Sequence, residues 1–420
     1  SFALATATGT ADVLNINLDS NAAIDLTSAA AQVTAANIET INIVGDDKTA
    51  TNASDTNLMQ LIATKATTIN VSGHDGLTLT NTGNTKVTTF DASGVTNSNA
   101  IGTDTAAKMA VTFTSANTSV AAQVSITGGA GDDVLQGNVG VDTISGGSGA
   151  DTITATAGND VSTGGAGNDT FAFTKALLIA NSGTTATFDG GAGTDILDFN
   201  EDNVTNIVDA DFRGITSVET LTTGDGTNNV VFGASADATG IKTVTGGTGA
   251  DTLDFSSVDF DNAVTIDSGI GADVITLAAG TDQVATILAS ASGNLDADGL
   301  VVVDNGAAGN LDATDTLALT AAATMVTGFT VGTDKVNLAA FSLTGQDAVV
   351  TTAVADSLDD VANGEYALIY GTLAGTTLTV AASGASTHTV LIYDADTAGT
   401  QESDVIVLNG ILTTSDLILV

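Results

Sequence analysis

A nine-residue repeat between Gly128 and Ala172 constrains the fold of this chain more than any other feature. In nines, the stretch reads GGAGDDVLQ, GNVGVDTIS, GGSGADTIT, ATAGNDVST and GGAGNDTFA. Three of the five match the pattern G-G-x-G-x-D-x-U-x, where U is a large apolar residue, and the other two keep the glycine at position four and the aspartate at position six. Each nine supplies a glycine turn and then a short strand. Two nines therefore make one coil of a right-handed parallel β-roll, in which turns n and n+2 stack on the same side.

The stacked turns predict sites for a hard cation. Glycine lets the backbone bend and present carbonyl oxygens, and the aspartates of stacked turns lie about one strand spacing (~4.8 Å) apart. Carboxylates this close repel one another unless a divalent ion lies between them, and calcium prefers a shell of oxygen ligands, so we expect about three calcium ions in the five nines. A run of flexible Gly/Asp turns is the alternative, and five repeats in register argue against it. The predicted metal-site residues of this block are Gly129, Gly131, Asp133, Gly140, Asp142, Gly147, Gly149, Asp151, Gly158, Asp160, Gly165, Gly167 and Asp169.

The composition of the chain indicates an all-β protein rich in turns. Asp and Glu number 49 against 8 Lys and Arg, and most of the acid is Asp, whose short side chain suits turns and calcium loops. Proline is absent, as expected for central strands, which need every backbone N–H. The net charge of −41 excludes ordinary nucleic-acid binding and disfavours binding to anionic lipid. Cysteine is absent, which excludes disulfides, and no apolar stretch is long enough to predict a transmembrane helix or direct membrane insertion.

Short strand-like segments occupy residues 1–127. Several alternate apolar residues with Asn or Thr, which is typical of half-buried strands. Their irregular spacing favours a parallel β-helix with variable loops; a β-sandwich is the alternative, but the Asn-Gly type of hairpin turn is scarce. Ser54–Lys65 is the one predicted helix, capped by Ser54 or Asp55. The predicted strands are Val13–Leu18, Ile38–Val44, Thr68–Val71, Gly76–Thr80, Val111–Thr114 and Val124–Thr127.

Single copies of the glycine motif return after residue 172. They are GGAGTDILD at 190–198, GGTGADTLD at 246–254, SGIGADVIT at 268–276 and a degenerate copy, TGDGTNNVV, at 223–231. The sixth positions Asn228, Asp251 and Asp273 are spaced by about one β-helix coil, so we expect the solenoid to continue with longer coils. We expect calcium between Asp251 and Asp273, whereas Asp195 is a more isolated candidate ligand in the sequence.

Two weaker patterns flank these repeats. Asn37–Asn42 (NIETIN) is echoed by Thr216–Leu221 (TSVETL), which favours one architecture on both sides of the roll. Asn294–Gly299 resembles the first half of an EF-hand loop, but position twelve is Asn305 and not Glu, so a polar turn is the better interpretation.

The glycine motif fades beyond about residue 290, where a closing β-structure is expected because an uncovered final coil is an edge strand that invites aggregation. Its candidate strands lie in Gly328–Phe341, Tyr366–Tyr370, Val390–Tyr393 and Val405–Leu408. The predicted segments are a parallel β-helix-like segment at 1–127, the β-roll at 128–172, a continued β-solenoid at 173–290, and a C-terminal β cap at 291–420.

The nonapeptides resemble those of the RTX proteins, which leave bacteria by type I secretion. Gly76–Thr85 (GLTLTNTGNT), Thr89–Ser93 (TFDAS) and Val111–Val120 (VTFTSANTSV), followed by GGAGDD, resemble more closely the RTX surface-layer (S-layer) proteins. This resemblance implies export in an unfolded state, guided by an uncleaved type I secretion signal within 291–420, and folding outside the cell on meeting calcium. It also implies assembly with copies of itself into a two-dimensional lattice at the cell surface, with 1–127 as a lattice segment.

In that family the C-terminal part builds the lattice and a separate N-terminal part binds surface polysaccharide. No such anchor is apparent here and the chain lacks an initiating Met, so we expect it to be a C-terminal piece of a longer protein. The ligand roles of the nonapeptide carry over directly to Asp133, Asp151 and Asp169. They carry over less directly to Asp142 and Asp160, whose repeats lack the leading Gly-Gly pair.

Three functions fit these patterns: an S-layer subunit, an RTX adhesin, and the RTX part of a secreted hydrolase. A zinc protease needs H-E-x-x-H, but the two histidines, His74 and His388, stand in other contexts. The nearest approach to an esterase G-x-S-x-G surrounds Ser148 inside a repeat, and its last position is Ala150. A carboxylate-pair glycosidase is a further alternative, but basic and aromatic groove residues are sparse. Adhesins usually carry tandem Ig-like modules of about a hundred residues each, and the sequence shows no repeat of that length. We therefore expect a structural protein and not an enzyme.

Overall fold

The structure is a computed structural model. It describes residues 2–3, 9, 11–19, 23–28, 31–46, 56–96, 105–181, 186–199, 201–258, 260, 263–271, 273–278, 285–288, 300–303, 316–319, 324–327, 329, 331, 333–338, 345–350, 365–374, 377–380, 386–394 and 403–418. The chain divides into two compact units, Ser1–Asn200 with Ala210–Thr220 (unit 1) and Glu201–Asp209 with Leu221–Val420 (unit 2). The helices among the described residues are short: α1 (Lys175–Asn181), α2 (Ala234–Asp237), η1 (Asp209–Phe212) and η5 (Thr414–Asp416). None of the helices in the described segments is long and apolar enough to cross a membrane.

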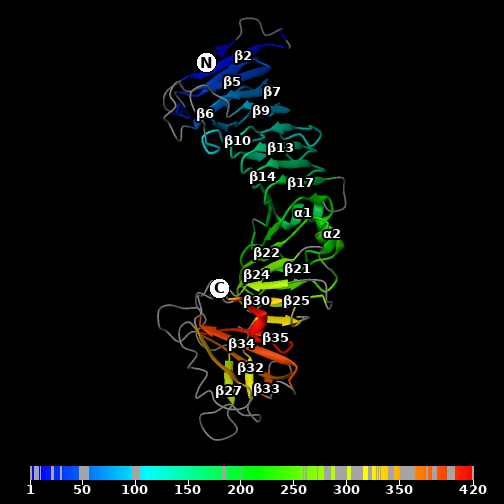
Figure 1. Ribbon diagram of the computed structural model, residues 1–420. Helices are drawn as coiled ribbons and strands as arrows, with labels where there is room; N and C mark the ends of the chain where they lie inside the picture. Colours follow the sequence, from blue (N-terminus) through cyan, green and yellow to red (C-terminus); the bar gives the residue numbers. More distant parts are fainter. Residues whose placement is uncertain are drawn as a thin grey trace. The chain divides into compact units, whose positions relative to one another are not determined.

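Unit 1 is a parallel β-solenoid built from two sheets, and successive coils add one strand to each (Figure 1). The first sheet pairs, in order, β2 (Val13–Asp19), β5 (Thr40–Asp46), β7 (Thr68–Gly73), β9 (Thr89–Val95), β11 (Ser125–Thr127), β13 (Thr143–Ser148), β15 (Val161–Ala166), β17 (Thr187–Ala192) and β19 (Ile215–Thr216). The second pairs β1 (Phe2–Ala3), β4 (Val33–Ala36), β6 (Asn57–Ile62), β8 (Leu77–Thr80), β10 (Val111–Thr114), β12 (Val134–Gln136), β14 (Thr152–Thr154), β16 (Thr170–Phe173) and β18 (Ile196–Phe199), and β3 (Asp25–Leu26) also pairs with β6. A further strand, β20, spans Thr220–Thr222.

The register of these strands confirms the predicted coil. Leu135 of β12 pairs with Ile153 of β14, and Ile144 of β13 pairs with Ser162 of β15, so two nines advance the chain by one coil. Parallel pairing continues without a break from β9 through β11 to β13. The repeats are therefore an uninterrupted part of the solenoid and not an appended module.

The core of unit 1 consists of inward-facing side chains stacked along the solenoid. In the second sheet, Phe113, Leu135, Ile153 and Phe171 succeed one another in register, and all are buried. Phe90, on the facing first sheet, stacks on Phe113 with ring centroids 4.0 Å apart. Inward apolar residues alternate with Thr or Asn on the outer face because successive side chains of a strand point to opposite sides.

Unit 2 begins as a solenoid and ends as an antiparallel sheet. In the first of its two sheets all the strands pair in parallel: β22 (Thr243–Thr248), β24 (Val264–Ile270), β26 (Ala285–Leu288), β30 (Lys335–Asn337) and β36 (Leu417–Ile418). The other sheet pairs β21 (Asn229–Val231), β23 (Thr252–Asp254), β25 (Val274–Thr276) and β29 (Thr324–Thr327) in parallel, and then β35 (Ser403–Asn409), β34 (His388–Asp394), β32 (Glu365–Ala374), β33 (Thr377–Val380), β28 (Thr316–Leu319) and β27 (Leu300–Val303). A last strand, β31 (Gly345–Val350), pairs with β32.

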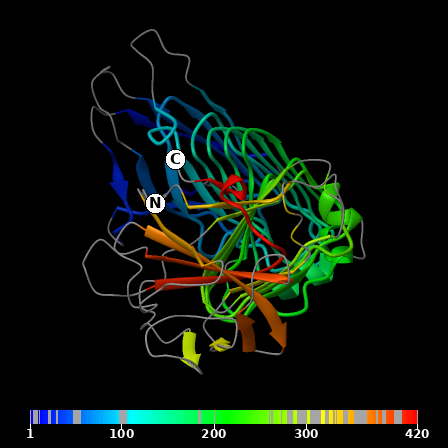
Figure 2. The same ribbon diagram turned by 60° about the horizontal axis from the view of Figure 1, so that its bottom comes forward.

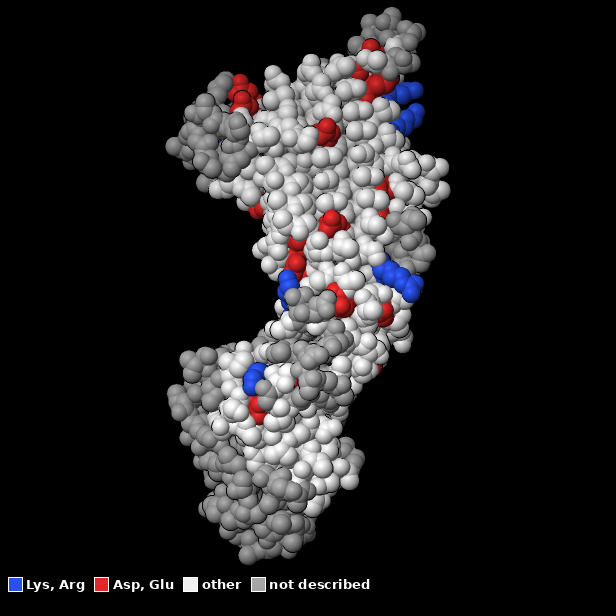
Figure 3. All heavy atoms as spheres, turned by 45° about the vertical axis from the view of Figure 1, so that its right-hand side comes forward, with Lys and Arg blue, Asp and Glu red and all other residues white. Residues whose placement is uncertain are grey.

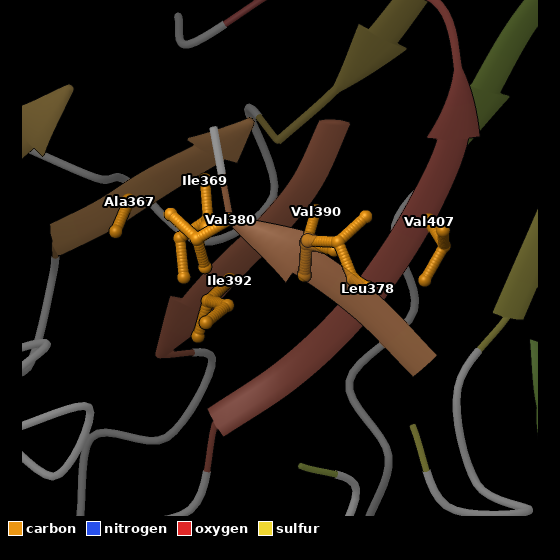
Figure 4. Packing of buried hydrophobic residues seen from close by; sticks show 7 residues of the cluster. All are labelled: Ala367, Ile369, Leu378, Val380, Val390, Ile392 and Val407. Carbon is orange, nitrogen blue, oxygen red and sulfur yellow. The ribbon is translucent and has the colours of Figure 1, made fainter. Parts of the chain in front are cut away.

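The antiparallel part of unit 2 has its own apolar core, which lies on the strands shown orange to red in Figure 2. Figure 4 shows side chains from β32, β33, β34 and β35 meeting across this sheet. The cluster contains Ala367, Ile369, Leu378, Val380, Val390, Ile392 and Val407, all buried. The predicted β-rich C-terminal structure is thus present. The EF-hand-like stretch at 294–299 lies outside the described residues.

The predicted helix at Ser54–Lys65 is wrong, because its described part contains the strand β6. Within β6 the side chains of Met59 and Leu61 are fully buried, while Leu58 and Gln60 lie at alternating, half-buried positions. Parallel pairing with β8 fixes this strand in the stack. Burial of one alternating face in a sheet outweighs the helix propensity of Leu, Met and Gln, which is a weak preference.

Candidate calcium-binding sites

Four aspartates form one row along the turns that lead from the first sheet to the second in unit 1. We call Asp133, Asp151, Asp169 and Asp195 the first aspartate column. The backbone N–H of Asp133 donates to Asp151 Oδ1 (2.8 Å), and that of Asp151 donates to Asp169 Oδ1 (2.8 Å). The N–H of Asp169 in turn donates to Asp195 Oδ1 (2.7 Å). Each carboxylate therefore ties its own coil to the preceding one, and all four side chains are buried.

Three of the four carboxylates in this column offer their second oxygen to a cation, whereas Asp133 Oδ2 accepts the N–H of Gly129 (2.6 Å). Oδ2 of Asp151, Asp169 and Asp195 is buried and accepts no hydrogen bond in the structure. A buried carboxylate oxygen without a partner is costly, so its persistence calls for a positive ligand. These three oxygens fit calcium, which is a hard cation and takes carboxylate and carbonyl oxygens.

Backbone carbonyls lie next to these free oxygens. A methyl group placed on Gly146 would overlap with both Asp151 Oδ2 and the carbonyl oxygen of Gly164, one coil further on. The same holds for Gly164, between Asp169 Oδ2 and the carbonyl of Gly190. Glycine at repeat position one therefore keeps open the space in which a carboxylate oxygen and a carbonyl oxygen approach each other.

The glycines at repeat position four are required by backbone conformation. Gly149 has φ +123° and Gly167 has φ +136°, in the region that L-residues rarely adopt. A Cβ on Gly149 would overlap with the carbonyl of Gly131, and one on Gly167 would overlap with the carbonyl of Gly149. The turns consequently stack at a separation that only glycine permits, with their carbonyls directed towards the next coil.

Burial raises the pKa of the carboxyl groups in the first aspartate column. The pKa of Asp133 rises to about 7, and that of Asp151 to about 8, because desolvation disfavours the charged form. The negative charges of Asp133 and Asp169 add to the effect on Asp151. The pKa of Asp169 rises to about 6, again chiefly through desolvation. A divalent cation would reverse this balance, since it stabilises the charged carboxylates that burial destabilises.

Asp142 and Asp160 form a second aspartate column on the opposite turns of unit 1, at the repeats that contain Gly140 and Gly158. The N–H of Asp142 donates to Asp160 Oδ1 (2.9 Å), so the stacking matches that of the first column. Here, however, both Oδ2 atoms are occupied. The N–H of Asn138 donates to Asp142 Oδ2 (2.5 Å), and the hydroxyl of Thr156 donates to Asp160 Oδ2 (3.1 Å). These repeats, which lack the Gly-Gly pair, offer fewer free oxygens to a cation.

Unit 2 contains a third group of repeat turns. The N–H of Asp251 donates to Asp273 Oδ1 (3.0 Å), so the two predicted ligands are stacked. Asp273 Oδ2 is buried without a hydrogen bond, and burial raises the pKa of Asp273 to about 6. A methyl group on Gly246 would overlap with the carbonyl of Ser268 and lie close to Asp251 Oδ2. The arrangement repeats that of the first aspartate column.

The structure sharpens the ligand set in two ways. Within the described residues, no three acidic or histidine side chains form a metal cluster, so any calcium site must combine carboxylates with backbone carbonyls. Asp195, isolated in the sequence, is not isolated in the structure: the N–H of Asp169 donates to its Oδ1, and Phe171 of the preceding coil pairs with Leu197.

Sequence reasoning missed the residues at the ends of the repeat turns. Glycines at position one, such as Gly146, were not singled out, although the Gly-Gly pair signalled them. Glu219 also belongs to this set: its Oε2 accepts the N–H of Asp195 (3.0 Å), as an aspartate does elsewhere in the column. Glu39 accepts the N–H of Asp12 (3.1 Å) in the same way, which confirms the echo between NIETIN and TSVETL.

Comparison with known proteins agrees with this geometry. The family model of the RTX calcium-binding nonapeptide repeat matches residues 125–153, 136–171 and 263–284. No curated protein matches the chain at a significant level. Repeats of this family bind calcium and are typical of proteins secreted by the type I route, which indicates an extracellular location. The chain therefore carries several RTX calcium-binding nonapeptide repeats, set within a parallel β-solenoid.

Proposed function

We propose that this chain is a structural, calcium-dependent subunit of a bacterial S-layer. In this proposal it leaves the cell unfolded through a type I exporter, folds outside on binding calcium, and assembles with copies of itself into a two-dimensional lattice. The observation that carries the proposal is the continuity of the solenoid through the repeats, from β9 to β11 and β13. Calcium bound to the first aspartate column would stiffen unit 1 itself, as a load-bearing lattice element requires.

The charge distribution supports a role in self-assembly. The chain has a net charge of −41, and such a charge opposes both compaction and association. Many of its aspartates are nevertheless buried in turns, including the whole first aspartate column. On the face shown in Figure 3, acidic side chains appear in small, separate groups, with a few Lys and Arg, on a largely uncharged surface. Calcium bound in the turns would neutralise the buried charge and leave outer faces on which copies of the chain can approach one another.

The surroundings of the histidines favour a structural role over hydrolysis. His74 Nδ1 lies 2.9 Å from the carbonyl oxygen of Thr96, and the adjacent Asp75 pairs with Lys108 (3.3 Å). His388 Nδ1 lies 2.8 Å from the hydroxyl of Thr387. Neither histidine is thus placed as a base oriented by an acid and facing a nucleophile.

Electron microscopy of the purified chain, with and without calcium, tests the proposal. Ordered two-dimensional sheets should form at millimolar calcium and disperse when a chelator is added. Asp91→Asn, on the outer side of β9, is a control that should leave the calcium concentration needed for folding unchanged, whereas Asp151→Asn should raise it. Folded monomers that persist at millimolar calcium would refute the lattice and favour an adhesin.

A further inference from the structure

The first aspartate column does not end with its last nonapeptide. Its last aspartate, Asp195, faces the turn of TSVETL, which has no Gly-Gly pair and no aspartate at the sixth position. Glu219 occupies that position, and its Oε2 accepts the N–H of Asp195 (3.0 Å). The backbone pairing is also kept, since the N–H groups of Glu219 and Thr220 donate to the carbonyl of Asp195 (3.1 and 2.9 Å).

Oxygen atoms converge on Asp195 from this turn. The Asp195 side chain is fully buried, and its Oδ2 accepts no hydrogen bond. A methyl group on Gly190 would overlap with the carbonyl oxygen of Ser217, and would lie 2.5 Å from Asp195 Oδ2. The carbonyl of Ser217 therefore takes the place that a glycine carbonyl takes in the preceding coils. Ser217 has φ +55°, so this turn adopts a left-handed conformation without glycine to bring its carbonyl there.

Two carboxylates and a carbonyl therefore meet at this turn. Glu219 Oε2 accepts the N–H of Asp195, and the carbonyl of Ser217 and Asp195 Oδ2 both approach the space kept open by Gly190. Oxygen atoms arranged in this way around a fully buried, unpartnered carboxylate oxygen form a negatively charged environment of the kind that a divalent cation needs.

We propose that Asp195, the carbonyl of Ser217 and Glu219 form an additional calcium site, completed by a turn that is not a nonapeptide. This site lies outside the residues matched by the repeat family. It rests on calcium binding by the repeats and not on assembly into a lattice. The chain thus ends its column in unit 1 with glutamate, whose longer side chain reaches the same backbone N–H from a turn without the Gly-Gly pair.

Counting bound calcium by equilibrium dialysis or calorimetry tests this site. Glu219→Gln keeps an oxygen that can accept the N–H of Asp195 but loses the charge, so the affinity of one site should fall by about tenfold or more. Asp195→Asn should remove two ions, because Asp195 also stacks on Asp169. Asp25→Asn, at an exposed position of β3, is the control and should leave the calcium count and affinities unchanged. The proposal would be overturned if the Glu219→Gln variant bound as many calcium ions as the unmodified chain, and with the same affinities.

A different observation carries a second inference, in the degenerate repeat TGDGTNNVV of unit 2. Asn228 stands at the aspartate position, and its Oδ1 accepts the N–H of Val204 (2.8 Å), as an aspartate would. Its amide nitrogen donates to the carbonyls of Gly224 (2.7 Å) and Gly226 (3.3 Å) and to Asp251 Oδ1 (2.9 Å). These acceptors are two turn carbonyls and the carboxylate of the next coil, which are the kinds of oxygen that would otherwise surround an ion.

We infer that the Asn228 amide replaces calcium between this turn and the next. An NH₂ group brings two donors to oxygens that would repel one another without a cation. The coil that begins at Asn228 is thereby held without metal, and the neighbouring pair Asp251–Asp273 is left as the calcium-binding pair of this group.

Restoring the aspartate of the repeat at position 228 tests this inference, because the variant should gain a calcium ion. Asn228→Asp removes the donors and supplies a second carboxylate, so the variant should bind one more calcium ion per chain than the unmodified protein. Asn206→Asp, at an exposed position, is the control and should leave the count unchanged. A folded Asn228→Asp protein with no additional ion would overturn the inference. So would a failure of that variant to fold at saturating calcium, because the ion should then neutralise the new charge.

Discussion

Asp151 is the residue whose substitution tests the calcium column most directly. It stands in the middle of the first aspartate column, donating its N–H to Asp169 Oδ1 and accepting the N–H of Asp133 (both 2.8 Å). Asp151→Asn retains an oxygen for the N–H of Asp133, so the solenoid pairing should survive. The variant loses the negative charge and the free Oδ2 that a calcium ion would bind, and it should weaken the sites on both sides.

The expected loss follows from linkage between binding and folding. Extracellular calcium modules bind with dissociation constants of about 0.1–1 mM, so at 10-fold to 100-fold excess each site adds about 1.4–2.7 kcal/mol to the free energy of unfolding. Loss of two sites should therefore cost about 3–5 kcal/mol under these conditions. A substitution at Asp195, which also touches two proposed sites, should have a comparable effect.

Urea unfolding followed by circular dichroism, at saturating calcium and in chelator, measures this difference. In chelator, at a pH above the pKa of Asp151, Asp151→Asn should be more stable than the unmodified chain. Burial raises this pKa to about 8, so above it the unmodified chain must bury a charged carboxylate. Where the metal-free chain does not fold, the calcium midpoint of folding replaces the urea midpoint, and Asp151→Asn should raise it. An equal loss of stability with and without calcium would refute the reasoning, since Asp151 would then act only through its hydrogen bonds.

Three further outcomes are expected. Protons should compete with calcium, because burial raises the pKa of Asp151 to about 8 and that of Asp273 to about 6. The calcium midpoint of folding should therefore rise as the pH falls from about 8 to about 6, whereas the metal-free fold should become less stable as the pH rises through this range. A pH series of calcium titrations checks both expectations. Gly149→Ala should lower the free energy of unfolding by about 1–3 kcal/mol more than Gly83→Ala, measured by thermal or urea unfolding. Both glycines have positive φ, but only a Cβ on Gly149 meets a backbone carbonyl, so equal losses would contradict the stacking argument. Lys108→Met should cost about 3–5 kcal/mol by leaving the buried partner Asp75 without its ammonium group, and the double variant with Asp75→Leu should recover most of that loss in the same assay.

The sequence by itself determined the local rules of this fold. A nine-residue period with glycine and aspartate at fixed positions dictates alternating turns and strands, and strict periodicity leaves one way to stack them. The register of Leu135 on Ile153 was therefore predictable, as was the stacking of Asp133 on Asp151. The segments 13–18 and 111–114 were predictable as strands because their alternation survives without the motif.

Only the tertiary structure decided which oxygens are free. Asp142 and Asp151 occupy the same motif position, yet Oδ2 of Asp142 accepts the N–H of Asn138, while Oδ2 of Asp151 has no partner. Asp195 joins the column although an insertion separates it from Asp169 in the sequence, because β16 and β18 still pair in register. The strand β6 and the role of Glu219 were likewise decided by neighbouring coils. Stacking brings together residues some twenty positions apart, and where the period breaks, the local sequence does not encode which residues those are.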